Sequence, residues 1–380
     1  MLPGAIISGM EDIRPFRIEV PDEDLADLRE RLRRTRWPER ECVVGPGNAI
    51  DWSQGMPLDY TRELADYWAQ GYDWRQREAR LNRFDQFVTE IDGLDIHFIH
   101  QRSGNPDALP LVITHGWPGS IVEFAKVIEP LTADFHVVCP ALPGYGFSGK
   151  PTTAGWKVER IAQAWDTLMT RLGYHRYGAQ GGDWGATVTT QIGRNGNGCI
   201  GIHLNMPMAP PPGPVDAPTA EELAAIEAFA HYQKWDAGYS KQQSTRPQTL
   251  GYGLADSPVG QLAWIVEKFW AWTDCDGHPE NVLSRDEMLD DVMMYWLTNS
   301  AASSARLYWE SFGTLGGGKV EVPTGVACFP KEIMKAPRSW CEARYNITHW
   351  TDMPRGGHFA AFEQPELFVE DVRAFFNTLR

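Results

Sequence analysis

Short apolar runs alternate with helical segments between residues 109 and 204, and this alternation limits the possible folds more than any other feature. The apolar runs are rich in β-branched residues and end in glycine or proline, as in "LPLVITHG", "FHVVCPALPG" and "CIGIHLNMP". "SIVEFAKVIEPL" and residues 158–172 lie between such runs and have helical periodicity. Apolar strands that alternate with amphipathic helices predict an α/β protein, with a mostly parallel central sheet flanked by helices.

The residues before this alternation differ in character. Residues 1–92 are predicted to form an N-terminal extension of helices and loops that packs on the rest of the protein. Within it, Leu25, Leu28 and Leu32 lie at helical spacing and indicate one amphipathic helix. Two β-like runs that meet at Asp92-Gly93 indicate a hairpin at the end of the extension.

The alternation also stops after residue 213 and resumes at residue 317. Residues 214–316 are helical in pattern and rich in Trp and Tyr. They separate residues 93–213, the first part of the predicted core, from residues 317–380, the second part. A helical block inserted into an α/β core, after the strands that carry the chemistry, is most simply a lid over the functional site.

Composition and charge narrow the functional class. A chain of 380 residues suits one large catalytic domain with additions. The formal net charge of −15 argues against nucleic acid or anionic membranes as partners. No apolar run approaches the roughly 20 residues of a membrane span, and the first residues do not read as a secretory signal. The six cysteines have no CxxC spacing, so we expect free thiols in a cytoplasmic protein. The histidines have no spacing typical of metal ligands, so we expect no metal site. A homodimer is the default expectation for the assembly.

The stretch "YGAQGGDWGATVTT", residues 177–190, is the main functional motif. An apolar run ends in two glycines and Asp183, and a helical segment follows at once. Small residues on both sides of a central residue are the layout of a nucleophile elbow, a strand-to-helix turn that is too tight for large side chains. Serine hydrolases place a serine at the tip of this turn. Asp183 in that position predicts an aspartate nucleophile.

Two more polar residues are candidates for the acid and the base, and with Asp183 they follow the chain order nucleophile, acid, base. Glu332 follows a strand-like run in "FPKEI", and His358 lies in "RGGHFAAFEQPE". Ligands of such sheets bind beyond the carboxyl ends of the strands, and this chain order is the one expected of the α/β-hydrolase fold. "HGWPGS" follows an earlier strand, so the backbone N–H groups of Trp117 and Trp184 are predicted to form an oxyanion hole.

An aspartate at the elbow restricts the reaction. A carboxylate with a pKa of about 4 is already anionic at neutral pH and needs no base before it attacks. Attack on an acyl group would give an anhydride, whereas attack on a saturated carbon gives an ester that water can hydrolyse. The pattern therefore predicts an epoxide or a haloalkane as substrate, with His358 and Glu332 activating the water of the second step. A ligand-binding protein without activity on the same scaffold is a further alternative.

The leaving group separates an epoxide hydrolase from a haloalkane dehalogenase. Halide leaves without a proton, whereas the alkoxide from an epoxide needs an acid, which a tyrosine with a pKa of about 10 can supply. The predicted lid holds the tyrosines Tyr232, Tyr239, Tyr252, Tyr295 and Tyr308. Aromatic residues also fill helical cores, so the tyrosines alone leave both substrates open. The same holds for Trp264, Phe269 and Trp270 in "WIVEKFWAW", which either pack in the lid or contact the substrate.

Taken together, these motifs resemble the epoxide hydrolases of the α/β-hydrolase superfamily, of the microsomal type with an N-terminal segment. The resemblance runs from about residue 12 to the C-terminus and rests on "FRIEVPDEDLADLRERLRRTRWPE", "HGWPGS", "LPGYGFSGKP", "GGDWGA", "VPTGVACFP" and "RGGHFAAFEQPE". The membrane anchor that precedes this pattern in microsomal enzymes is absent, which predicts a soluble protein.

The resemblance implies a set of roles. Asp183 would be the nucleophile, His358 the base and Glu332 the acid that orients it. Tyr239 and Tyr308 would protonate the epoxide oxygen. The reaction would convert an epoxide and water to a diol without a cofactor.

Overall fold

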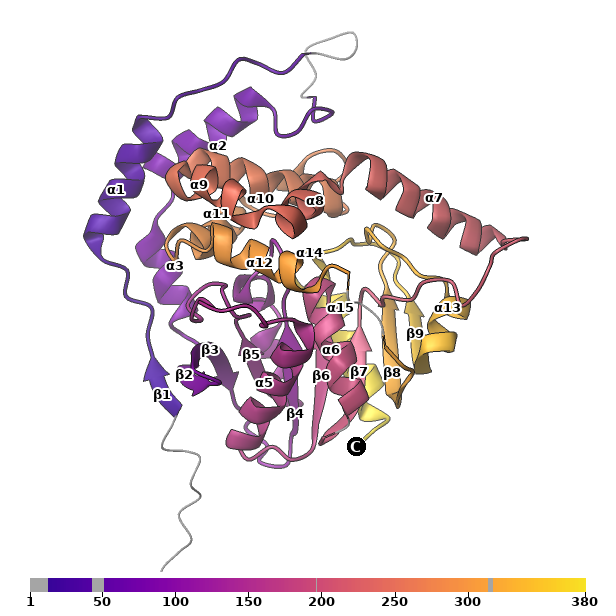
Figure 1. Ribbon diagram of the computed structural model, residues 1–380. Helices are drawn as coiled ribbons and strands as arrows, with labels where there is room; N and C mark the ends of the chain where they lie inside the picture. The colour runs from indigo at the N-terminus through magenta and orange to yellow at the C-terminus, as the bar shows by residue number, and fades with distance from the viewer. Residues whose placement is uncertain (1–12, 43–50, 196, 314–316) are drawn as a thin grey trace, which may run out of the picture.

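The alternating apolar runs form the centre of one sheet, with helices on both faces and a helical layer above it (Figure 1). The computed structural model describes residues 13–42, 51–195, 197–313 and 317–380. Within them, nine strands pair in the order β1-β2-β3-β5-β4-β6-β7-β8-β9. The strands are β1 Ile13–Phe16, β2 Gln86–Ile91, β3 Leu94–Gln101, β4 Leu109–Thr114, β5 Phe135–Pro140, β6 Tyr177–Gly181, β7 Cys199–Leu204, β8 Val320–Cys328 and β9 Tyr345–Asp352. Those from β5 to β9 along the sheet pair in parallel, whereas β1, β2 and β3 are antiparallel, so the predicted α/β-hydrolase fold is confirmed.

The central strands are apolar throughout because both faces of the sheet are covered. Val112 of β4 belongs to the same apolar cluster as Trp165, whereas its neighbours Leu111 and Ile113 belong to the cluster of Phe375. The helices of the core are α4 Ile128–Leu131, α5 Val158–Arg171, α6 Asp183–Asn195, α13 Arg338–Arg344, α14 Ala360–Glu363 and α15 Pro365–Asn377. Alternate residues of a strand point to opposite faces, so a run buried on both faces loses the polar alternation of a surface strand.

One segment departs from its predicted form. "SIVEFAKVIEPL" is not one helix but a 3₁₀ turn, η2 Ile121–Phe124, followed by the single turn of α4. Pro130 lies in that turn and has no backbone N–H to donate to the carbonyl of residue 126, so a continuous helix is interrupted there. At the other end, the Ser120 hydroxyl accepts a hydrogen bond from the Val122 N–H and fixes the start of η2.

The N-terminal extension adds both helices and strands. Its helices are α1 Asp22–Arg33, α2 Leu58–Gln70 and α3 Trp74–Leu81, and α1 buries Leu25, Leu28 and Leu32 as predicted. β1 and β2 extend the sheet, and β2 forms the predicted hairpin with β3. Asp92 and Gly93 have φ values of 53° and 77° at the turn, the left-handed conformation that tight hairpins require. Figure 1 shows α1 and α2 beside the helices of the upper layer.

That upper layer lies over the carboxyl ends of the central strands (Figure 1). Its elements fall within residues 214–316 and are α7 Ala220–Trp235, α8 Gly238–Thr245, α9 Pro247–Asp256, α10 Pro258–Trp272, η3 Pro279–Asn281, α11 Arg285–Trp296 and α12 Ala301–Ser311. None of the helices in the described ranges combines the length and apolarity that a bilayer crossing requires.

Candidate active site

Asp183 stands at the turn between β6 and α6. Its φ of 51° lies in the left-handed region that residues other than glycine rarely adopt, so the backbone is strained at this side chain. The flanking glycines are required by close packing. A Cβ on Gly181 would collide with the carbonyl oxygen of Gly185, and a Cβ on Gly185 would collide with that of Thr114. The motif "GGDWG" therefore has the geometry of a nucleophile elbow with a carboxylate at its tip.

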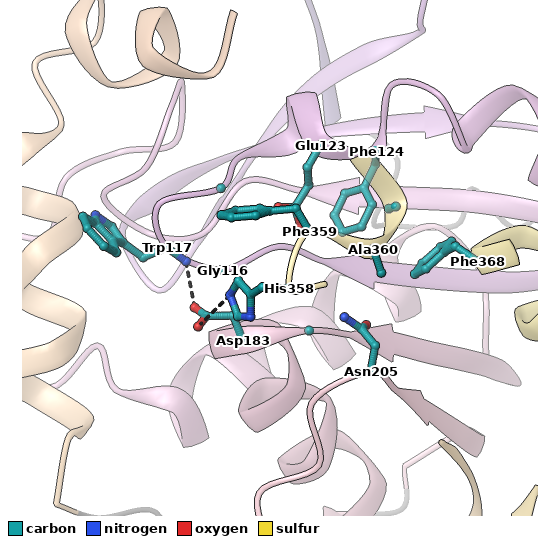
Figure 2. Close-up of a pocket in the computed structure, with 13 residues that line it drawn as sticks. Gly116, Trp117, Glu123, Phe124, Asp183, Asn205, His358, Phe359, Ala360 and Phe368 are labelled. Atoms are coloured by element: carbon teal, nitrogen blue, oxygen red, sulfur yellow. Dashed lines mark hydrogen bonds and ion pairs between the residues drawn. The ribbon is translucent and has the colours of Figure 1, made fainter. Parts of the chain in front are cut away.

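The loop after β4 holds one oxygen of this carboxylate. The Trp117 N–H donates a hydrogen bond of 2.8 Å to Asp183 Oδ1 (Figure 2). Gly116 leaves room for the same oxygen, because a Cβ there would overlap it. Trp184 lies in the first turn of α6, where backbone N–H groups have no partner within the helix. Its part in the oxyanion hole stays a prediction.

Glu332 and His358 come together with Asp183 from the loops that follow β8 and β9. His358 Nδ1 lies 2.6 Å from Glu332 Oε1, and His358 Nε2 lies 3.4 Å from Asp183 Oδ2. Glu332 Oε1 also accepts a hydrogen bond from the Ile333 N–H, at 2.7 Å. The backbone N–H of His358 donates a hydrogen bond of 2.8 Å to the carbonyl of Trp272 at the end of α10. The imidazole is thus oriented by one carboxylate and faces the other.

The two carboxylates control the charge of His358. Burial alone would lower the pKa of its imidazole, but Glu332 and Asp183 together raise it well above the usual value. An ester on Asp183 would remove one of these negative charges. The pKa of His358 would then fall at the stage of a two-step reaction at which a base is needed.

Tyr239 of α8 and Tyr308 of α12 are buried over the nucleophile, with ring centroids 5.7 Å apart. The Trp117 ring stacks on Tyr239 at 4.8 Å, and the Trp184 ring meets Tyr308 edge-on at 4.8 Å. Burial raises the pKa of both phenols well above its usual value, and the Asp183 carboxylate contributes to both shifts, so both hydroxyls are protonated at neutral pH.

The two hydroxyls differ in their partners. The Tyr239 hydroxyl is 3.0 Å from that of Tyr232 on α7, another of the tyrosines in residues 214–316. The Tyr308 hydroxyl makes no hydrogen bond within the described part of the chain. A buried, protonated hydroxyl without an acceptor suits a substrate oxygen.

An apolar cavity of about 200 Å³ opens above Asp183 and is bordered by both tyrosines. It shares Met208, Phe229 and Met334 with a second cavity of about 450 Å³ that reaches Trp340.

The predicted substrate contacts Trp264, Phe269 and Trp270 do not border the cavity at Asp183. Phe269 packs on Phe359 and Trp270 stacks on Trp52, while the Trp264 indole N–H donates to Gln243. Their contact with substrate stays a prediction.

Helix α11 holds the loop that carries Trp117. The Tyr295 hydroxyl donates to the Gly119 carbonyl at 2.7 Å, and the Ser120 hydroxyl donates to Asp291 Oδ1 at 2.6 Å. Sequence reasoning assigned no role to these contacts, because they join segments that are 171 and 176 residues apart.

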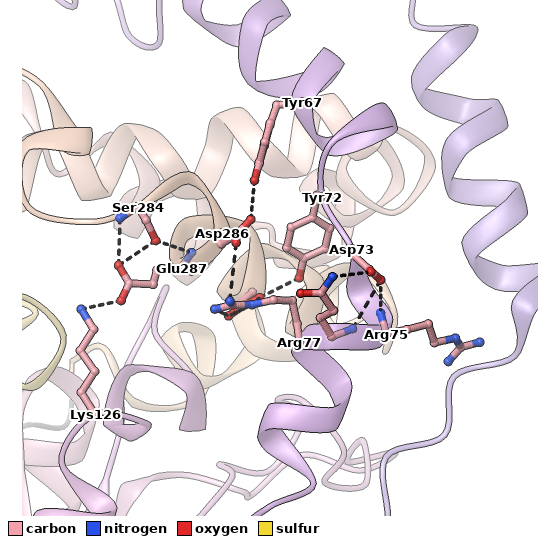
Figure 3. A network of polar contacts seen from close by, with 11 residues as sticks. Tyr67, Tyr72, Asp73, Arg75, Arg77, Lys126, Ser284, Asp286 and Glu287 are labelled. Atoms are coloured by element: carbon pink, nitrogen blue, oxygen red, sulfur yellow. Dashed lines mark hydrogen bonds and ion pairs between the residues drawn. The ribbon is translucent and has the colours of Figure 1, made fainter.

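The extension contacts another side of the same helix, through Asp286 and Asp290 (Figure 3). The Tyr72 hydroxyl and the Arg77 guanidinium both bind Asp290, at 2.8 Å each, and the Tyr67 hydroxyl binds Asp286 at 2.7 Å. Helix α11 therefore contacts both the extension and the loop that carries Trp117, which we call the oxyanion loop after its predicted role. No group of three or more His, Cys, Asp or Glu side chains in the described ranges is arranged to hold a metal ion.

Comparison with known proteins agrees with this geometry. Residues 13–124 match the family described as "Epoxide hydrolase N terminus", and residues 110–220 match "alpha/beta hydrolase fold". The "Putative epoxide hydrolase" of Stigmatella aurantiaca is 51% identical over 97% of this chain and 86% of its own length. Epoxide hydrolase 1 of Sus scrofa is 36% identical over 99% of this chain and 92% of its own length. The chain belongs to the epoxide hydrolase family.

Solved epoxide hydrolases share the whole arrangement. The Aspergillus niger enzyme is 35% identical with a TM-score of 0.86, over 97% of this chain and 96% of that one. The juvenile hormone epoxide hydrolase of Bombyx mori is 32% identical with a TM-score of 0.87, over 97% and 95%. The resemblance found in the sequence motifs is confirmed, including the N-terminal segment of this epoxide hydrolase type.

Proposed function

We propose that this family member hydrolyses an epoxide to a vicinal diol through a covalent ester on Asp183. The observation that carries the proposal is the pairing of an aspartate at the elbow with two protonated phenols, Tyr239 and Tyr308, at the same cavity. Asp183 Oδ1 accepts the Trp117 N–H, so Oδ2 is the oxygen that attacks a ring carbon. The ring C–O bond breaks, and the alkoxide takes a proton from one of the phenols.

The second step releases the diol. His358 takes a proton from water as the water oxygen attacks the ester carbon of Asp183, and Glu332 stabilises the imidazolium. Negative charge develops on Oδ1, where the Trp117 N–H already points. The diol oxygen leaves with the proton from His358, and the phenolate regains its proton from solvent.

The phenols favour an epoxide over a haloalkane. A halide leaves without a proton, so a dehalogenase gains nothing from acids at the leaving group. The unpartnered Tyr308 hydroxyl is matched to an alkoxide. The second cavity of about 450 Å³, which shares three lining residues with the cavity at Asp183, also supports a bulky, apolar epoxide over a small aliphatic one.

A single-turnover experiment in ¹⁸O-water tests the proposal. We expect the label to enter the Asp183 carboxylate and the diol to be unlabelled, as read by mass spectrometry of both. His358→Gln should stop after the first step and accumulate the ester, and Asp183→Asn should form neither ester nor diol. Label in the first-turnover diol would mean that water attacks the ring directly. Chloride release from chloroalkanes without diol formation from styrene oxide would favour the dehalogenase.

A further inference from the structure

A small cavity borders Asp183 and His358 but not the two tyrosines (Figure 2). The cavity has a volume of about 20 Å³, and one water molecule needs about 10–15 Å³. Phe124, Phe359 and Phe368 form much of its wall. The cavity therefore has room for a water molecule beside the atoms that the second step uses.

Glu123 also borders this cavity, from η2 of the oxyanion loop. No group in the described part of the chain forms a hydrogen bond or ion pair with its carboxyl. Burial, and then the nearby Asp291 carboxyl, raise the pKa of Glu123 well above its usual value. Glu123 is only partly exposed, and a water in the cavity can form a hydrogen bond with its carboxyl.

The "HGWPGS" motif leaves space for this carboxyl. A Cβ on Gly119 would overlap Glu123 Oε2, just as a Cβ on Gly116 would overlap Asp183 Oδ1. The two glycines of one loop thus admit one carboxyl oxygen each. Gly119 does not have a positive φ, so its backbone does not require glycine, and a larger side chain there would have to displace the Glu123 carboxyl.

The water of the second step needs two acceptors for its hydrogens. His358 Nε2 takes one of them as the water oxygen attacks Asp183. Asn205 also borders the cavity, but its Oδ1 accepts a hydrogen bond from Gln180 Nε2 at 2.8 Å, which leaves its amide nitrogen, a donor. Among the side chains that border the cavity, Glu123 provides the remaining acceptor.

We propose that Glu123 positions the hydrolytic water: its carboxyl oxygen accepts one hydrogen while His358 removes the other. This inference rests on the proposed function, because it requires the ester on Asp183. A water O–H bond breaks and its proton goes to His358 Nε2 as the water oxygen bonds to Asp183 Cγ. The bond between Cγ and the alkyl oxygen then breaks, and that oxygen takes the proton from His358. The hydrogen bond to Glu123 stays in place and directs a lone pair of the water at Cγ.

Glu123→Leu tests the role by separating the two steps. Stopped-flow tryptophan fluorescence measures ester formation and decay with styrene oxide. We expect an unchanged rate of ester formation and a decay at least about tenfold slower, because a misplaced reactant commonly costs about 100-fold. kcat and KM should fall together with kcat/KM unchanged, and the ester should accumulate in the mass spectrum. Glu123→Gln, which keeps an oxygen acceptor at the same reach, should remain within about threefold of the parent protein, since one acceptor suffices.

Gly119→Ala is the matched variant that displaces the carboxyl without removing it. Its new Cβ must push Glu123 Oε2 aside, so we expect slow ester decay with normal ester formation again. Normal decay in both Glu123→Leu and Gly119→Ala would overturn the proposal, and so would equal slowing of both steps, which marks a structural role. If the parent protein forms no ester, the proposed function itself fails. If the ester forms and these variants hydrolyse it normally, only the role of Glu123 fails.

Discussion

Arg77→Met, in the contact between extension and lid, should destabilise the protein strongly at neutral pH. Arg77 Nε lies 2.8 and 2.9 Å from the two carboxylate oxygens of Asp290, and Asp290 is buried. Without the guanidinium, the Tyr72 hydroxyl is the one group in the described ranges still bound to that carboxylate. Removing one partner of a buried ion pair costs about 3–5 kcal/mol, so we expect a loss of that size in the free energy of unfolding.

The pH dependence of this loss identifies its cause. Burial already raises the pKa of Asp290 above its usual value despite Arg77, so loss of the cation raises it further. A carboxyl with a raised pKa in the folded state has no cost below its unfolded pKa of about 3.9 and destabilises as the pH rises. The deficit of Arg77→Met should therefore be largest at pH 7 and shrink towards pH 4.

Urea unfolding followed by tryptophan fluorescence at pH 7 and pH 5 measures the effect. Arg77→Met/Asp290→Asn is the matched control, because it also removes the buried charge and should recover most of the stability. A loss below about 1 kcal/mol at pH 7 would mean that the pair contributes no more than a surface pair does. A double variant no more stable than Arg77→Met would refute the buried charge as the cause.

Three more outcomes follow from the site. Tyr308→Phe should slow ester formation by about 100-fold, as expected for loss of a general acid, and leave ester decay unchanged in stopped-flow fluorescence. Met334→Trp should fill space where the two cavities adjoin, because Met334 borders both, so kcat/KM should fall for long apolar epoxides and hold for propylene oxide in parallel diol assays. Asp183→Asn should lower the pKa of His358, because it removes one of the two carboxylates beside the imidazole; an NMR titration that gives the parent value would contradict this.

The sequence was sufficient for features that depend on local chemistry or on chain order. The elbow at Asp183 could be predicted because close packing admits only glycine at Gly181 and Gly185. Glu332 and His358 could be placed because each follows a strand whose end lies at the same edge of a parallel sheet. The hairpin at Asp92-Gly93 and the buried leucines of α1 follow from turn preference and helical spacing.

Features that depend on contacts between distant segments could not be predicted. α10 buries residues on several of its sides, so spacing does not tell whether Trp264, Phe269 or Trp270 faces substrate. In the sequence, Glu123 is one polar residue in a short helical pattern. Its proposed role depends on the cavity that it shares with His358. The break in that helix is different, because Pro130 lies in the same pattern and its missing N–H indicates where a continuous helix is interrupted.

The order of contacts joins the extension to the loop that carries Trp117 by way of α11. Asp290 of α11 is bound by the extension, and Asp291, the next residue, is bound by Ser120 of the oxyanion loop. Consecutive residues of a helix point in directions about 100° apart, so these two neighbouring carboxyls, both buried, contact different segments. Trp117, on the same loop as Ser120, must keep its N–H aimed at Asp183, because catalytic donors lose their effect when displaced by about 1 Å. Loss of the extension contacts at Asp286 and Asp290 would therefore weaken the support that α11 gives to the Trp117 loop.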